Sequence, residues 1–127
     1  MGQVISFADG IWKLYDMDNP LKERAVNYTV YYMKPNYFVD MTLGVRTPLV
    51  ETLSETHVEL KSLVADDLED VFFQMQGENW SRDGEARELI EAKGLAHTSM
   101  SVGDVVRDDT TGMHYVVRPI GFRKMIP

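Results

Sequence analysis

The stretch that decides the fold runs from His97 to Val106 and reads His-Thr-Ser-Met-Ser-Val-Gly-Asp-Val-Val. It follows a helical pattern that ends at Gly94, and it leads into two short apolar runs separated by a turn. Small hydroxyl residues, a glycine and an aspartate between apolar positions indicate a joint whose side chains hold the local backbone in place. We therefore expect this stretch to connect a helix to a C-terminal β-hairpin.

Two helices are predicted before this joint. The first covers residues 66–76, where Asp66 and Glu69 have the spacing of a capping box. The second covers residues 83–93, where Asp83 and Arg87 are spaced to pair across one turn. Gly94 then takes the left-handed position that ends many helices. The apolar spacing predicts that five side chains point inward: Leu68, Val71, Phe72, Leu89 and Ile90.

Period-two alternation predicts the strands. In residues 25–33 one face consists of Val26, Tyr28, Val30 and Tyr32. In residues 56–64 the alternation places Val58, Leu60 and Val64 inward and His57, Glu59 and Lys61 outward. After the joint, Val102, Asp104 and Val106 form one row, residues 108–112 form a turn, and Met113, Tyr115 and Val117 return. Asp104 therefore belongs to an inward-facing row, where a carboxylate needs hydrogen-bond donors, and we expect them from Thr98, Ser99 and Ser101.

The order of strands, two helices and then strands predicts an α+β domain. We expect an antiparallel sheet with two helices packed on one side and a C-terminal β-hairpin. The length of 127 residues suits one domain. We place this domain at residues 25–127 and interpret residues 1–24 as an N-terminal extension packed on it. Residues 37–50 give no clear pattern.

The composition excludes several classes of protein. With 20 acidic and 13 basic side chains the net charge is −7, which disfavours binding to nucleic-acid phosphates in general. The chain has no cysteine and so no disulfide or thiolate metal site. It has no apolar run of about 18 residues and no pattern of a secretory signal. We expect a protein without a membrane partner, located in the cytoplasm (that of a bacterial host if phage-encoded).

The last third of the chain resembles the YodL-like domain. The resemblance rests on His97, on Ser99-Met100-Ser101-Val102-Gly103-Asp104-Val105, on Tyr115 and Val117, and on Gly121, Phe122 and the final Pro127. Met100 stands where that family has leucine, and Gly103 where it has a second serine. The segment from Met75 to Arg87 is also similar to small phage and bacterial proteins with this ending. The resemblance implies an accessory protein of a phage or mobile element and supplies no reaction.

A hydrolase would need a serine nucleophile with a base in reach and an oxyanion hole. His97, Ser99, Ser101 and Asp104 are the candidate residues, but the Gly-x-Ser-x-Gly elbow is absent. We favour a structural role for Ser99, Ser101, Gly103, Asp104, Gly121 and Phe122, and we predict no catalytic residue. The histidines at 57, 97 and 114 show no metal-site spacing, so we predict no metal and no cofactor.

The candidate binding residues gather near the second helix. Trp80, Arg82 and Arg87 combine an aromatic ring with guanidinium groups, as interfaces often do, and Glu85 and His97 complete the set. The leading hypothesis is a non-enzymatic accessory protein that binds a protein partner. The second is a nucleic-acid or nucleotide-binding module that uses Trp80, Arg82, Arg87 and Arg118. The third is an enzyme centred on His97 and Asp104.

Overall fold

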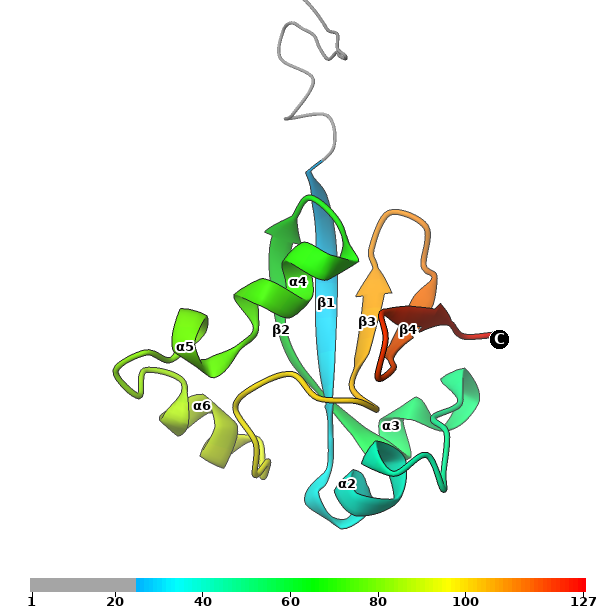
Figure 1. The fold of residues 1–127 in the computed structure, drawn as a ribbon, viewed down its shortest axis with the longest axis horizontal. Coiled ribbons are helices and arrows are strands. Elements are labelled where there is room, and N and C mark those ends of the chain that lie inside the picture. The colour runs from blue at the N-terminus through cyan, green and yellow to red at the C-terminus, as the bar shows by residue number, and fades with distance from the viewer. Residues whose placement is uncertain (1–24) are drawn as a thin grey trace, which may run out of the picture.

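A computed structural model describes residues 25–127 of the chain (Figure 1). The N-terminal extension expected at residues 1–24 lies outside this range. Five strands form one antiparallel sheet in the order β2-β1-β3-β4-β5. Their bounds are β1 Val26–Met33, β2 His57–Ala65, β3 Val105–Asp108, β4 His114–Val117 and β5 Phe122–Lys124. The predicted α+β fold is confirmed, with β1 between β2 and β3.

The alternation of β2 differs from the prediction because the strand contains a bulge. Val30 pairs with Lys61 but Tyr31 pairs with Glu59, so Leu60 is an extra residue. Because side chains alternate between the two faces of a sheet, one extra residue in a strand reverses the face to which every side chain beyond it points. The prediction for Val64 is therefore wrong, since this side chain is 55% exposed. His57, expected outside, is 3% exposed.

Helix α4 spans Leu68–Gln74 and is shorter than the predicted helix at 66–76. Its N-cap is Asp67, whose carboxylate accepts a hydrogen bond from the Asp70 amide. The Asp70 side chain in turn accepts one from the Asp66 amide. The N-cap is thus one residue later than expected, and the reciprocal hydrogen bond comes from the amide before the N-cap and not from the N-cap itself. Figure 1 shows α4 lying across β1 and β2, where Val71 is fully buried.

The predicted helix at 83–93 is reduced to α6, Arg87–Ala92, and a short helix α5, Gly77–Trp80, precedes it. Asp83 lies in the turn before α6, so the ion pair expected between Asp83 and Arg87 across one helical turn does not form within the described residues. Gly94 does adopt a left-handed conformation, with φ of 71°. Of the five side chains predicted to point inward, Val71 and Ile90 are buried, Leu68 and Leu89 are half-buried, and Phe72 is exposed.

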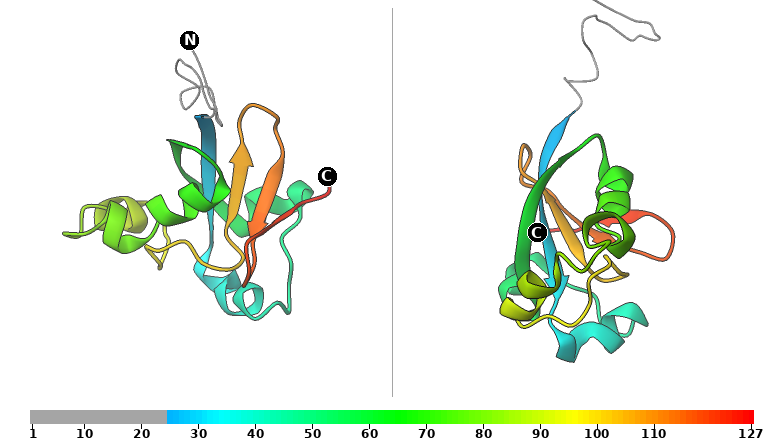
Figure 2. Two further views of the ribbon diagram at one scale, coloured as in Figure 1. Left: turned by 45° about the horizontal axis from the view of Figure 1, so that its top comes forward. Right: turned by 90° about the vertical axis from the view of Figure 1, so that its left-hand side faces the viewer.

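Residues 35–56, which include the segment 37–50 without a clear pattern, contain three short helices: α2 Pro35–Thr42, η1 Val50–Thr52 and α3 Leu53–Thr56. They explain why the sheet has a core on each face. The larger core joins β1 and β3 to α4 and α6, through residues such as Val30, Val71 and Ile90. The smaller core contains Leu53, Val105, Val116 and Met125. Figure 2 shows α2 and α3 at one end of the sheet, away from α4.

The C-terminal hairpin has the predicted turn, which the Gly112 amide closes by donating to the Asp108 carbonyl oxygen at 2.7 Å. A second turn follows β4 at residues 118–121. The Arg118 amide donates to the Gly121 carbonyl oxygen at 2.9 Å, and the chain reverses there. Phe122 then begins β5, which becomes one edge of the sheet.

Gly103 is packed so closely that no side chain fits at this position. Its φ is +100°, and an added Cβ would lie 2.7 Å from Met33 Sδ and 3.0 Å from Met41 Cβ. The glycine therefore lets the joint before β3 approach the end of β1 and α2. This is the physical reason for glycine at 103.

Gly103→Ala should destabilise the protein more than Gly112→Ala. Both positions have positive φ, but an added Cβ at Gly112 has no atom within 4 Å. The alanine at 112 costs left-handed strain alone, about 1–2 kcal/mol, whereas overpacking at 103 adds about 1–3 kcal/mol. Urea unfolding measures both variants, and equal losses of unfolding free energy would contradict the close packing.

Candidate functional site

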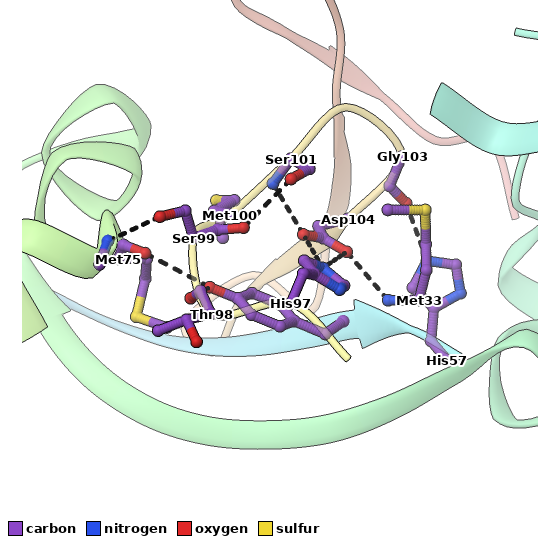
Figure 3. A network of polar contacts seen from close by, with 12 residues as sticks. Met33, His57, Met75, His97, Thr98, Ser99, Met100, Ser101, Gly103 and Asp104 are labelled. Carbon is purple, nitrogen blue, oxygen red and sulfur yellow. Dashed lines mark hydrogen bonds and ion pairs between the residues drawn. The ribbon is translucent and has the colours of Figure 1, made fainter. Parts of the chain in front are cut away.

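Asp104 is the centre of a buried polar cluster that joins three segments of the chain (Figure 3). The side chain is 0% exposed. Its Oδ1 accepts a hydrogen bond from the Met33 amide at 2.9 Å, and Oδ2 accepts one from the Ser101 amide at 2.8 Å. His97 Nε2 donates to Oδ2 at 2.9 Å. We call Met33, His97, Ser101 and Asp104 the Asp104 cluster.

The donors to Asp104 differ in part from those expected. The Ser101 amide is among them, but Thr98 and Ser99 are not. The Met33 amide comes from the end of β1, which is 71 residues away in sequence. Burial raises the pKa of Asp104, while the hydrogen bonds from His97 and the two amides act in the opposite direction. The cluster thus attaches the joint to the central strand.

His97 lies inside the fold against two aromatic rings. It stacks on Tyr32 with ring centroids 4.5 Å apart, and Phe38 lies at 4.8 Å with a tilted ring. Donation to Asp104 places a proton on Nε2, and Nδ1 is buried without a hydrogen-bond partner among residues 25–127. The candidate binding residue His97 is therefore occupied in packing and in the Asp104 cluster.

The two serines bind backbone groups. Ser99 Oγ accepts a hydrogen bond from the Gly77 amide at 2.8 Å, and Ser101 Oγ donates to the Ser99 carbonyl oxygen at 3.1 Å. Within the described part of the chain neither hydroxyl is hydrogen-bonded to His97. A nucleophile must be paired with its base, so this arrangement does not support the hydrolase hypothesis.

His57 is a second buried histidine, and its hydrogen bonds define its tautomer. Nε2 lies 2.8 Å from the Gly103 carbonyl oxygen, which can only accept, so this nitrogen carries the proton. Nδ1 accepts from the Thr56 hydroxyl at 2.7 Å. Burial lowers the pKa of His57. The sequence pattern placed this side chain outside and so missed its role in holding the joint.

The structure separates Trp80 from the other candidate binding residues. Trp80 is half-buried, donates from Nε1 to the Thr98 carbonyl oxygen at 2.9 Å, and has the Lys61 ammonium 5.2 Å from its ring centroid. Arg82 and Arg87 line a different pocket together with Asp83 and Glu91. The mixed charges there do not make a positive groove.

The remaining candidates are also dispersed. Arg118 lines a third pocket, beside Phe72 and Phe122. Glu85 is exposed and accepts a hydrogen bond from the Asp83 amide at 2.9 Å. The predicted binding residues therefore do not form one site, since Trp80 lines a pocket other than that of Arg82 and Arg87.

A cleft that the sequence did not indicate lies between the start of α4 and the strands β1, β4 and β5. It has a volume of about 540 Å³. Tyr28, Leu68, Tyr115 and Phe122 supply its apolar lining, Asp67, Glu69 and Asp108 its carboxylates, and Gly121 completes it. We call this site the aromatic cleft. The sequence signal for this cleft was that Tyr28 and Tyr115 occupy alternating positions of two predicted strands. Ordinary core residues occupy the same kind of position, so this signal did not single out a cleft.

The sheet register explains how the aromatic cleft forms. Tyr28 is opposite Asp108, and Val117 is opposite Phe122, so these side chains share one face of the sheet. Helix α4 lies across β1 and β2 (Figure 1), and Val106 and Val117 of the same face are also buried, so the open part of this face lies near Asp108, Tyr115 and Phe122. Burial raises the pKa of Tyr28, and Asp108 and Asp67 raise it further. The cleft is therefore electronegative.

A smaller hollow lies on the other face, beside β5. Pro48, Leu49, Val116, Met125 and Ile126 provide apolar groups, and Thr47, Arg123 and Lys124 complete the lining. Leu49 and Ile126 are 51% and 85% exposed. We call this hollow the C-terminal groove. It has the composition of an apolar contact surface, but it has no enclosed polar group that would select a ligand.

No protein-family model, curated protein or solved structure matches the chain. The resemblance to the YodL-like domain therefore stays a prediction. In residues 25–127 no helix is long and apolar enough to cross a bilayer. The same residues contain no group of three or more His, Asp or Glu placed to hold a metal ion.

Asp104→Asn should lower the unfolding free energy by about 1–3 kcal/mol. The amide nitrogen of asparagine cannot accept a hydrogen bond, so at least one buried donor of the Asp104 cluster loses its partner. Thermal and urea unfolding measure the loss, with the exposed Asp83→Asn as matched control. A variant that unfolds like the wild type but loses a binding activity would show that Asp104 serves function instead.

His57 should make the protein less stable as the pH falls below about 6.5, the ordinary value for histidine. Burial raises the pKa of Asp104, so this group acts in the opposite direction. The lowered pKa of His57 means that the unfolded chain takes up this proton before the folded one does. The stabilisation that comes from neutral His57 is complete above the pKa of this histidine in the unfolded chain, and it declines below that pKa. Urea unfolding between pH 7 and 5 should give a flatter pH dependence for His57→Gln, and an unchanged slope would contradict this origin. His114, whose pKa burial also lowers, supplies part of the remaining slope.

Proposed function

We propose that this protein is a small accessory protein of phage or mobile-element type that acts by binding another protein. The observation that carries the proposal is the aromatic cleft, which places three aromatic side chains in an open site of about 540 Å³. Aromatic residues are enriched in protein interfaces because they bury a large area with few rotatable bonds. The phage or mobile-element origin rests on the resemblance to the YodL-like domain.

Two features connect the cleft with that resemblance. Gly121 and Phe122 belong to the residues that resemble the YodL-like ending, and both line the aromatic cleft. Gly121 has a φ of 71°, which permits the turn that brings Phe122 to the cleft. In this proposal Gly121 and Phe122 shape the binding site, while the Asp104 cluster holds in place the strands that carry this site.

The acidic lining favours a protein partner over the nucleic-acid alternative. Three carboxylates line the cleft, and a phosphate backbone would be repelled by them. The two arginines at 82 and 87 share their pocket with two acidic residues. Neither site offers the contiguous positive surface that phosphate binding needs.

Selection of phage-displayed random peptides tests the proposal. Peptides selected on the wild-type protein should bind Tyr115→Ala at least about tenfold more weakly, because truncation of an aromatic residue at the centre of an interface costs roughly 1–2 kcal/mol or more. Tyr37→Ala is the matched control, since Tyr37 is half-buried beside Arg46 and outside the cleft. Circular dichroism verifies that each variant folds.

A second pair of variants covers the case in which Tyr115→Ala does not fold. Glu69→Arg reverses an exposed charge at the cleft, and Glu88→Arg reverses one on α6. The first should weaken or redirect peptide binding, and the second should not. Selection that yields no peptide, or peptides that bind all four variants like the wild type, would refute a protein-binding cleft.

A further inference from the structure

The aromatic cleft is chemically asymmetric, and this asymmetry specifies its ligand. Three aromatic side chains (Tyr28, Tyr115 and Phe122) line it together with three carboxylates. The face of an aromatic ring attracts a cation, most strongly where water is partly excluded. A carboxylate attracts the same cation by charge and by hydrogen bonding. Both kinds of lining group therefore favour a positively charged ligand and disfavour an anion.

Among residues 25–127 no basic side chain belongs to the lining of the cleft itself, although Arg118 lines an adjoining pocket that shares Glu69, Gly121 and Phe122 with it. The residues that line the cleft include no lysine, arginine or histidine. Lys124 is opposite Tyr115 and therefore on the same face of the sheet, but it is exposed and is not among the residues that line the cleft. The salt bridges of residues 25–127 join His97 to Asp104 and Arg107 to Asp109, so they leave the carboxylates of the cleft without an ionic partner.

These carboxylates keep acceptor capacity for a ligand. Asp67 uses Oδ1 to cap α4, and Asp108 uses Oδ1 for the amides of Thr110 and Thr111. The other oxygen of each aspartate has no hydrogen bond to a described residue, and Glu69 has none at either oxygen. A carboxylate offers about four acceptor directions, so a cationic donor can be accommodated without breaking the helix cap or the turn.

Tyr28 presents a further polar group to the cleft. Its side chain is only 5% exposed, yet it lines the cleft, and its hydroxyl makes no hydrogen bond to another residue in the range 25–127. The hydroxyl oxygen is itself open to the cleft, since the buried side-chain atom without a partner among residues 25–127 is His97 Nδ1. A donor that enters the cleft would reach both this hydroxyl and the neighbouring carboxylates.

We propose that the aromatic cleft binds a lysine or arginine side chain presented by a basic segment of the partner protein. This inference rests on the proposed function and names the chemistry of the partner. The cation lies against the rings of Tyr28, Tyr115 and Phe122, and the carboxylates of Asp67, Glu69 and Asp108 neutralise it. The net charge of −7 assists the encounter, because an acidic protein attracts a basic segment at long range.

An NMR titration with small probes tests the inference. The probes are the Nα-acetyl methylamides of lysine and arginine, and that of norleucine, which has an unbranched side chain like that of lysine but no charge. The charged probes should shift the ring signals of Tyr28 and Tyr115 saturably, and the norleucine probe should bind at least tenfold more weakly. The affinity of the charged probes should also fall as sodium chloride is added, because salt screens the carboxylates.

A neutralising variant supplies the matched comparison. Glu69→Gln combined with Asp108→Asn removes two charges but keeps side-chain size, and an asparagine oxygen can still accept the turn hydrogen bonds of Asp108. This double variant should lose at least tenfold in affinity for the charged probes. Glu88→Gln combined with Asp83→Asn removes two exposed charges outside the cleft and should bind like the wild type.

The outcomes separate this inference from the proposed function. Equal binding of the norleucine and lysine probes would overturn the charge preference, while peptides that depend on Tyr115 would still support a protein-binding cleft. Selected peptides that contain no lysine or arginine, but whose binding depends on Tyr115, would likewise overturn the charge preference and still support a protein-binding cleft. If neither the probes nor any selected peptide perturbs Tyr28 and Tyr115, both proposals fail.

Discussion

The hydrogen bonds to the buried Asp104 carboxylate are the constraint on which the rest of the structure depends. They attach the joint at residues 97–106 to the end of β1 through the Met33 amide. The cost of burying a carboxylate is offset only while each donor is in place. The location of β3, and through it of β4 and β5, therefore follows from this one side chain. Gly103 and His57 complete the attachment, because the glycine allows close approach and the histidine donates to its carbonyl oxygen.

The aromatic cleft is a consequence of the same attachment. With β3 held beside β1, the hairpin and β5 extend the sheet beyond the area that α4 covers. The uncovered part of the face carries tyrosine and phenylalanine where a fully covered sheet would carry aliphatic residues. The acidic residues at the start of α4 stabilise the helix by capping it and supply the charge of the cleft. Fold stability and the proposed binding chemistry thus share side chains.

Most of the architecture could be predicted from local patterns, and the errors have specific physical causes. The strand at 26–33 and the hairpin turn follow from alternation and turn residues. The faces of β2 could not be predicted because a bulge at Leu60 depends on pairing with β1. The second helix was predicted too long, since the backbone at Asp83 and Gly84 forms a turn before Arg87. The candidate binding residues Trp80, Arg82 and Arg87 were expected together because they are close in the sequence.

The sequence by itself determined the α+β class, the joint at His97–Val106 and the burial of Asp104, because periodicity and residue type are local properties. Only the tertiary structure decided which donors reach Asp104, because Met33 is 71 residues distant. It alone also placed Tyr28, Leu68, Asp108 and Phe122 in one cleft. These residues come from four separate elements, and their proximity depends on sheet register and on the incomplete cover by α4, which no local pattern encodes.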